Sequence, residues 1–92
     1  MNKNRRKQIA SCADAVDKII SALEPICDAL ESLLSEEQDC MDNTPESLQG
    51  CVRYESMQEA CDALEDAIGS VGEAIDSLES AKENMEEACN VD

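Results

Sequence analysis

Apolar residues recur every seven positions along most of this chain, and this period constrains the fold more than any other feature. Three columns at heptad spacing run through residues 9–34: Ile9, Val16, Leu23 and Leu30; Cys12, Ile19, Ile26 and Leu33; Ala13, Ile20, Cys27 and Leu34. Two such columns give a narrow coiled-coil seam, whereas three give the wide apolar face of a bundled helix. We therefore expect a helix over about residues 4–38. Pro25 falls on its polar side, where it predicts a kink or the start of a new segment.

The second half of the chain keeps this period with smaller side chains. Its columns are Met57, Leu64, Val71, Leu78 and Met85; Cys61, Ile68, Ile75, Lys82 and Cys89; Ala60, Ala67, Ala74, Ala81 and Ala88. Lys82 is the one break in these columns, and the all-alanine column would let another helix approach closely. The pattern predicts a second helix over about residues 52–89.

Residues 39–51 carry the signals of a connection between the two helices. Thr44 before Pro45 is typical of an N-cap followed by the first helical position, and Gly50 is typical of a residue just past a helix end. These signals predict one short helical turn over residues 45–49. A short connection between helices of similar length predicts an antiparallel hairpin, so we expect an all-α fold with residues 1–92 as a single helical-hairpin domain.

The charge of the chain is strongly negative and unevenly placed. Asp and Glu number 22 against 7 Lys and Arg, with no His, for a net charge of −15. Four of the basic residues lie within the first seven positions. If the turn centres near residue 45, residues whose numbers add to about 91 face each other. The facing groups would then be the cations Arg5, Arg6 and Lys7 and the acids Glu86, Glu87 and Asp92.

A hairpin of two helices cannot bury a third apolar column on each of them, and small chains need a partner to cover such surface. We therefore expect a homodimer that forms a four-helix bundle. The sequence leaves the relative orientation of the two copies open.

The cysteines fit packing better than metal binding. No Cys-x-x-Cys pair of the kind found in zinc knuckles is present. Cys40 and Cys51 bracket the connection, and whether they form a disulfide stays open. Those expected to pack as small hydrophobic residues on the apolar columns are Cys12, Cys27, Cys61 and Cys89. The N-terminal segment does not read as a signal peptide, so we expect a cytoplasmic protein with reduced thiols.

The sequence contains few of the residues and motifs that catalysis uses. There is no His, no glycine-rich phosphate loop and no nucleophile elbow, and no carboxylates occupy inward columns to hold two metal ions. We therefore expect no enzyme activity and no catalytic, cofactor-binding or metal-binding residues. The N-terminal cations make a poor nucleic-acid site beside so many acids, so we expect neither direct nucleic-acid binding nor membrane binding.

Residues 42–55, DNTPESLQGCVRYE, resemble the D-N-x-P-E-x-L-Q-G-x-x-R-Y-E connection of small acidic helical-hairpin proteins of phages and prophages of Gram-positive bacteria. Cys51 stands where these proteins usually carry Ser. Most members have no assigned activity. The resemblance implies a phage context, in which small acidic proteins often bind host proteins, including nucleic-acid-guided defence nucleases.

Two classes of function follow. The first is a non-enzymatic phage or prophage accessory protein that acts in the host cytoplasm. It would bind and inhibit a host protein, for example a nucleic-acid-guided defence nuclease, through its acidic helix faces. The partner-binding residues expected are Asn43, Gln49, Arg53, Tyr54, Glu59, Asp62, Glu65 and Asp66. The alternative is a structural module for coiled-coil oligomerisation or scaffolding with no inhibitory role. Also open are whether the acidic surface mimics nucleic acid or only keeps the protein soluble, and whether the dimer core sequesters a small molecule.

Overall fold

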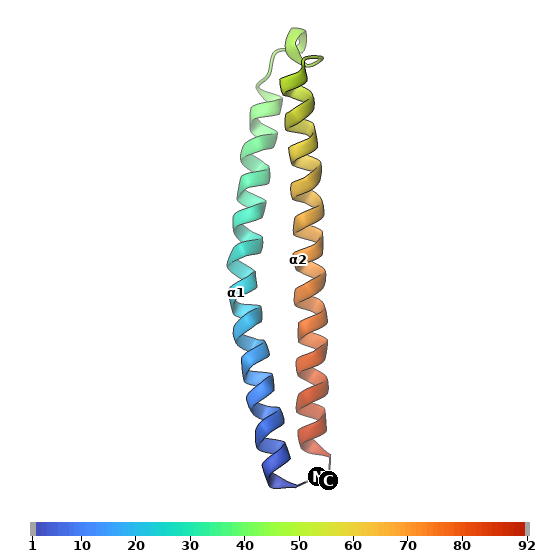
Figure 1. Ribbon diagram of the computed structural model, residues 1–92. Helices are drawn as coiled ribbons and strands as arrows, with labels where there is room; N and C mark the ends of the chain where they lie inside the picture. The colour runs from blue at the N-terminus through green and yellow to red at the C-terminus, as the bar shows by residue number, and fades with distance from the viewer. Residues whose placement is uncertain (1, 92) are drawn as a thin grey trace. The chain divides into compact units, whose positions relative to one another are not determined.

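The computed structural model describes residues 2–91, which form two long helices and one short one. Helix α1 spans Lys3–Asp42, the short 3-10 helix η1 spans Glu46–Leu48, and helix α2 spans Val52–Asn90. Helices α1 and α2 run in opposite directions and pack against each other as a hairpin (Figure 1). The all-helical hairpin predicted from the heptad period is therefore confirmed.

Contacts along the hairpin fall into two compact units. One consists of Met1–Pro25 with Gly72–Asp92, and we call it the terminal unit. The other is Ile26–Val71, which contains the turn, and we call it the connection unit. Helix α1 continues through Pro25 as one helix, so the new segment expected at this proline does not form.

Helix α1 ends at Asp42, four residues beyond the end expected from the sequence. Met41 explains the extension, because it continues the column of Ala13 and Ile20 and is only 8% exposed. The Cys61 thiol donates to Met41 Sδ at 3.5 Å and fixes this last turn against α2. The longer helix also corrects the expected register. The facing pairs Arg6–Val91, Asp17–Lys82 and Met41–Cys61 add to 97, 99 and 102 rather than to 91.

The connection contains the short helical turn expected within residues 45–49, as η1, but its ends are capped differently from the expectation. Pro45, rather than Thr44, is the N-cap residue of η1, and no side chain caps this helix. The Thr44 hydroxyl instead donates to the Cys40 carbonyl oxygen at 2.9 Å, in the last turn of α1, where carbonyl groups run out of partners within the helix. Gly50 does not adopt the left-handed conformation of a residue past a helix end, since no described glycine has a positive φ.

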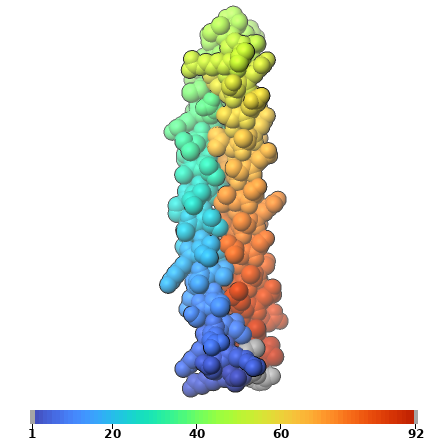
Figure 2. All heavy atoms as spheres, viewed as in Figure 1, coloured from blue at the N-terminus to red at the C-terminus, as the bar shows by residue number. Residues whose placement is uncertain are grey.

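Each unit buries only a few side chains where α1 meets α2. Ala13 and Ile20, each 5% exposed, are buried in the terminal unit, and Met41 and Cys61 are buried in the connection unit. Figure 2 shows the side chains of the two helices meeting along a seam. On α1 this seam uses the Ala13 column and the half-buried Ile9 column.

The Cys12 column lies outside the seam. Ile19, Ile26 and Leu33 of this column are 50%, 49% and 51% exposed, and Cys12 is also exposed. Cys12 is therefore not part of the hairpin core, contrary to the sequence-based expectation. The reason is geometric, because one neighbouring helix can cover only two adjacent columns of the three.

Candidate functional site

An exposed apolar stripe runs along α1. It continues the Cys12 column by one residue and consists of Cys12, Ile19, Ile26, Leu33 and Cys40, all of them exposed; we call it the α1 stripe. Three more exposed alanines at heptad spacing lie beside it: Ala15, Ala22 and Ala29. Sequence reasoning missed this neighbouring column, although its period was readable. Together the two columns give α1 a second apolar face, turned away from the seam.

Helix α2 contributes small residues to the same side of each unit. The seam uses the Met57 and Cys61 columns of α2. Because α2 runs antiparallel to α1, the alanine column of α2 then lies on the same side of the pair as the α1 stripe. The terminal unit shows this side as an apolar pocket of about 500 Å³, to which Ile9 and Cys12 of α1 and Met85 of α2 contribute. We call the α1 stripe with the alanine column of α2 the apolar face.

The opposite side of the terminal unit is charged. Lys82, the one break in the apolar columns of α2, donates from Nζ to Asp17 Oδ1 at 2.9 Å, and its Nζ lies 4.0 Å from Glu86 Oε1. The hydrogen bond to Asp17 raises the pKa of Lys82. Glu24 and Glu79 line a pocket on this side together with Asp17, Lys82 and Glu86. Lys82 therefore bridges the two helices on a side that is otherwise acidic.

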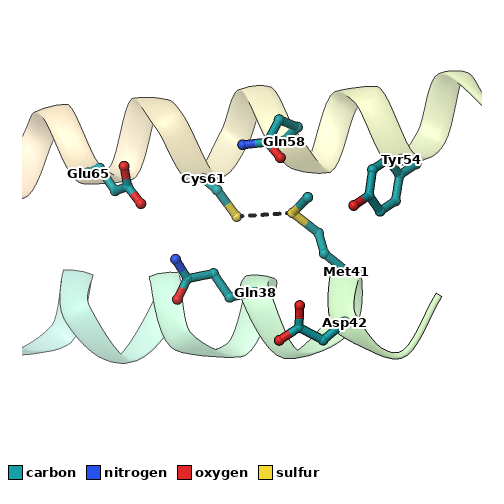
Figure 3. Close-up of a pocket in the computed structure, with 7 residues that line it drawn as sticks. All are labelled: Gln38, Met41, Asp42, Tyr54, Gln58, Cys61 and Glu65. Atoms are coloured by element: carbon teal, nitrogen blue, oxygen red, sulfur yellow. Dashed lines mark hydrogen bonds between the residues drawn. The ribbon is translucent and has the colours of Figure 1, made fainter. Parts of the chain in front are cut away.

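A polar pocket of about 390 Å³ opens on the connection unit above the contact between Met41 and Cys61. Figure 3 shows Tyr54 and Gln58 of α2 around the dashed Cys61–Met41 contact, with Gln38 and Asp42 contributed by α1. Cys61 is 2% exposed, and burial, followed by the nearby carboxylates, raises the pKa of its thiol. Because a thiolate is the reactive form, this environment keeps Cys61 an inert packing residue, as the sequence predicts.

The residues expected to bind a partner fall into two groups. Asn43, Arg53 and Tyr54 come together around a pocket of about 320 Å³ in the connection. Gln49 is exposed, and its side-chain amide donates to the Thr44 carbonyl oxygen at 3.5 Å. Cys40 and Cys51 line the same connection pocket as free thiols, so no disulfide joins them in this structure.

The four acidic residues of the expected site lie along α2 beyond the connection, and all are exposed. Glu59, Asp62 and Asp66 have the i, i+3, i+7 spacing of a single helix face. Glu65 lines the polar pocket above the Met41–Cys61 contact. Tyr54 lines this polar pocket and also the pocket of the connection, so it belongs to both. We call Glu59, Asp62, Glu65 and Asp66 the acidic ridge.

The N-terminal cations meet the end of α2, although through contacts that the sequence did not specify. Arg6 donates from Nη2 to the carbonyl oxygen of Val91 at 3.0 Å, and the Cys89 thiol lies 3.5 Å from the Arg6 carbonyl oxygen. Glu86, one of the expected acidic partners, instead lies near Lys82. Asp92, another, lies outside the described residues.

The two units differ sharply in charge. The connection unit carries 12 acidic residues and one basic residue, Arg53, for a net charge of −11. The terminal unit carries 10 acidic and 6 basic residues, for a net charge of −4. Most of the net negative charge of the chain therefore belongs to the connection unit, where the acidic ridge lies.

A scan against protein-family models, a search of curated proteins and a search of solved structures each found no match to this chain. Neither long helix, over residues 2–91, is apolar enough across its length to span a membrane. Within the same residues, no three or more acidic or cysteine side chains gather in a way that could hold a metal ion.

Proposed function

We propose that this chain is a non-catalytic protein-binding module that works as a homodimer. Two hairpins pack through their apolar faces into a four-helix bundle, and the acidic ridge of each copy binds a basic surface on another protein. The observation that carries the proposal is the division of the terminal unit into an apolar side and an acidic side, with the exposed Ile26 and Leu33 and the exposed acidic ridge in the connection unit. A hairpin with this division can bind a second copy through its apolar side and another protein through its acidic side at the same time.

The dimer is supported by the exposure of the α1 stripe. Its three large side chains are about half exposed, and they recur at the spacing that a second helix would match. Small residues on α2 flank them, so a second hairpin can approach without steric conflict. A few isolated apolar residues on a surface are ordinary, whereas a continuous exposed row marks a protein contact.

The basic partner is supported by the charge of the connection unit. Exposed carboxylates on a rigid helix offer regularly spaced negative charges, as a nucleic-acid backbone does. A protein groove shaped to hold such a backbone is the complementary surface. Together with the resemblance to phage proteins, this chemistry favours a host nucleic-acid-guided defence nuclease as the partner and inhibition as the outcome.

Reversing the acidic ridge is the test of partner binding. The variant Glu59→Lys, Asp62→Lys, Glu65→Lys, Asp66→Lys is expected to weaken binding to a guide-loaded defence nuclease of a Gram-positive bacterium by about 100-fold or more, because rim charges set electrostatic attraction. Isothermal titration at low and high salt measures the affinity, and DNA cleavage by the nuclease measures inhibition. Binding of the unaltered chain should also weaken steeply as salt rises.

The matched control reverses four exposed acids on the terminal half of α2. The variant Glu73→Lys, Asp76→Lys, Glu83→Lys, Glu87→Lys has the same change in net charge and is expected to bind almost as the unaltered chain does. Equal losses in both variants would mean that only net charge matters. Full inhibition by the acidic-ridge variant would show that the ridge is not the binding surface.

A structural module for oligomerisation or scaffolding is the second candidate, and the α1 stripe favours it specifically. In that case the apolar face would be the whole functional surface, and the charge would serve solubility. Assembly through apolar packing does not weaken as salt rises. A chain that dimerises but neither binds nor inhibits the nuclease at low salt fits this second function.

A further inference from the structure

We infer that the pocket of the connection holds an apolar side chain from a basic segment of a partner protein. This inference rests on the proposed binding of a basic partner and adds an anchor that does not depend on charge. The pocket has a volume of about 320 Å³, and all the residues that line it belong to the connection unit. We call it the connection pocket.

The connection pocket offers apolar surface that the connection unit itself leaves uncovered. Pro45, Leu48 and Met57 line it, and Leu48 is 52% exposed although it is a large apolar residue. Pro45 and Leu48 come from the connection, and Met57 comes from the start of α2. Pockets that hold a ligand or an anchoring side chain of a partner are concave and mainly apolar. An aliphatic side chain is therefore the occupant that this lining fits.

Polar groups with unused hydrogen-bonding capacity line the same pocket. Within residues 2–91, no hydrogen bond or ion pair involves the side chain of Asn43, Arg53 or Tyr54. An amide, a guanidinium and a phenol hydroxyl can donate to the carbonyl oxygens of an extended peptide and fix its direction. Arg and Tyr are also among the residue types that contribute most to binding energy at protein contacts.

The charge around the connection pocket selects the kind of segment that can enter it. Residues 39–59 carry five exposed acids, and Arg53 is their one base. Exposed carboxylates attract a segment rich in Lys and Arg and repel an acidic one. An apolar side chain flanked by cations therefore matches both the lining of the pocket and its surroundings.

Hydrogen bonds within the connection hold the pocket in shape before a partner binds. The Leu48 N–H donates to the Pro45 carbonyl oxygen at 2.8 Å, and the Cys51 N–H donates to the Leu48 carbonyl oxygen at 3.1 Å. The hydrogen bond from the Thr44 hydroxyl to the Cys40 carbonyl oxygen ties the pocket to the end of α1. A pocket that is already formed loses little conformational entropy when it is filled.

Two synthetic peptides test the anchor on the full chain. Both consist of lysines and arginines, and they differ only at one central position, which is leucine in one peptide and glycine in the other. Fluorescence anisotropy of the labelled peptides measures both affinities at low and high salt. The leucine peptide is expected to bind at least about 5-fold more tightly, because burial of its side chain adds to the attraction between charges that the two peptides share. This ratio should persist as salt rises, while both affinities fall.

The variant Leu48→Ser is expected to abolish the preference for leucine, and its matched control Val52→Ser is expected to keep it. Both variants replace an exposed aliphatic residue of the connection unit with serine and leave the net charge unchanged. Val52 is 78% exposed but does not line the connection pocket. Any difference between the two variants therefore reports on the pocket.

Three results would each overturn the anchor: equal affinities of the two peptides for the unaltered chain, a preference for leucine that survives Leu48→Ser, or one that Val52→Ser also abolishes. Conversion of a dimer to a monomer by Leu48→Ser in light scattering would assign the pocket to a second copy and overturn it as well. Failure of the proposed function looks different, because the glycine peptide, which only the charges attract, would then not bind at low salt. Binding by neither peptide would overturn both.

Discussion

The variant Ile26→Lys, Leu33→Lys is expected to be a monomer at concentrations where the unaltered chain is a dimer. Both side chains lie in the α1 stripe, about half exposed in the hairpin, and a second copy would remove the rest of their surface from water. Covering half of such a side chain is worth about 1 kcal/mol, so the four side chains of a dimer contribute about 4 kcal/mol, or nearly 1000-fold in dissociation constant. Lysine ammonium groups placed in the contact add a desolvation penalty to this loss.

Multi-angle light scattering across a dilution series measures this effect. The control variant Ser32→Lys, Ser35→Lys adds the same two charges to exposed positions of α1 outside the apolar face, and it is expected to remain a dimer. Circular dichroism should show helical signal in both variants, because the seam between α1 and α2 is unchanged. A dimeric Ile26→Lys, Leu33→Lys variant would exclude the α1 stripe as the contact between copies.

The second large effect concerns two adjacent isoleucines. When Ile20→Ala is added to the monomeric variant Ile26→Lys, Leu33→Lys, it is expected to lower the free energy of unfolding by about 2–4 kcal/mol. The substitution removes buried methyl groups and leaves a cavity in the seam. Ile20 is 5% exposed, and Ile19, its neighbour in sequence, is 50% exposed. The same substitution at Ile19 is therefore expected to cost less than about 1 kcal/mol in the monomer.

Urea denaturation followed by circular dichroism measures both values. The pair is a matched control, because residue type, helix and chemical change are the same and only the side of the helix differs. In the dimer the order of effects on self-association reverses, since Ile19 belongs to the α1 stripe and Ile20 does not. Equal losses of stability in the monomeric background would contradict the assignment of the seam to the Ala13 column.

The architecture was predictable because it depends on a period, and a period survives small local errors. Three apolar columns in each half required two long helices and left one column of α1 without cover, and Ile19, Ile26 and Leu33 are exposed as that reasoning demands. The break at Lys82 is explained by its partner Asp17, which no pattern within one helix could identify. Pairing across a hairpin depends on register, and register depends on where the turn lies.

The turn was the part that sequence patterns placed wrongly. Met41 continues an apolar column into residues 39–42, but the polar residues before it suggested that the helix had ended. Tertiary burial against Cys61 outweighed that local signal and lengthened α1. Thr44 hydrogen-bonds the end of α1 instead of capping the short helix, and Pro45 takes the N-cap position of η1. Both residues suit several positions in turns, so the sequence does not specify which one each takes.

The candidate site was only partly accessible from the sequence. The pocket formed by Asn43, Arg53 and Tyr54 follows from the compact connection, and the resemblance had marked these residues. The separation of an apolar side from an acidic side was harder to predict from the sequence. It depends on which apolar columns are buried in the seam between α1 and α2. Once the seam is assigned, the alanine columns and the α1 stripe fall on one side and the bridge from Lys82 falls on the other.

The mass of the unaltered chain in solution tests the central claim most directly. The chain has a mass of 10.0 kDa, and a homodimer through the apolar face has twice that mass. Sedimentation equilibrium under reducing conditions, over a range of micromolar concentrations, should give the dimer mass at the upper end and a reversible shift toward the monomer on dilution. A mass of 10.0 kDa at every concentration, with full helical signal, would contradict the account.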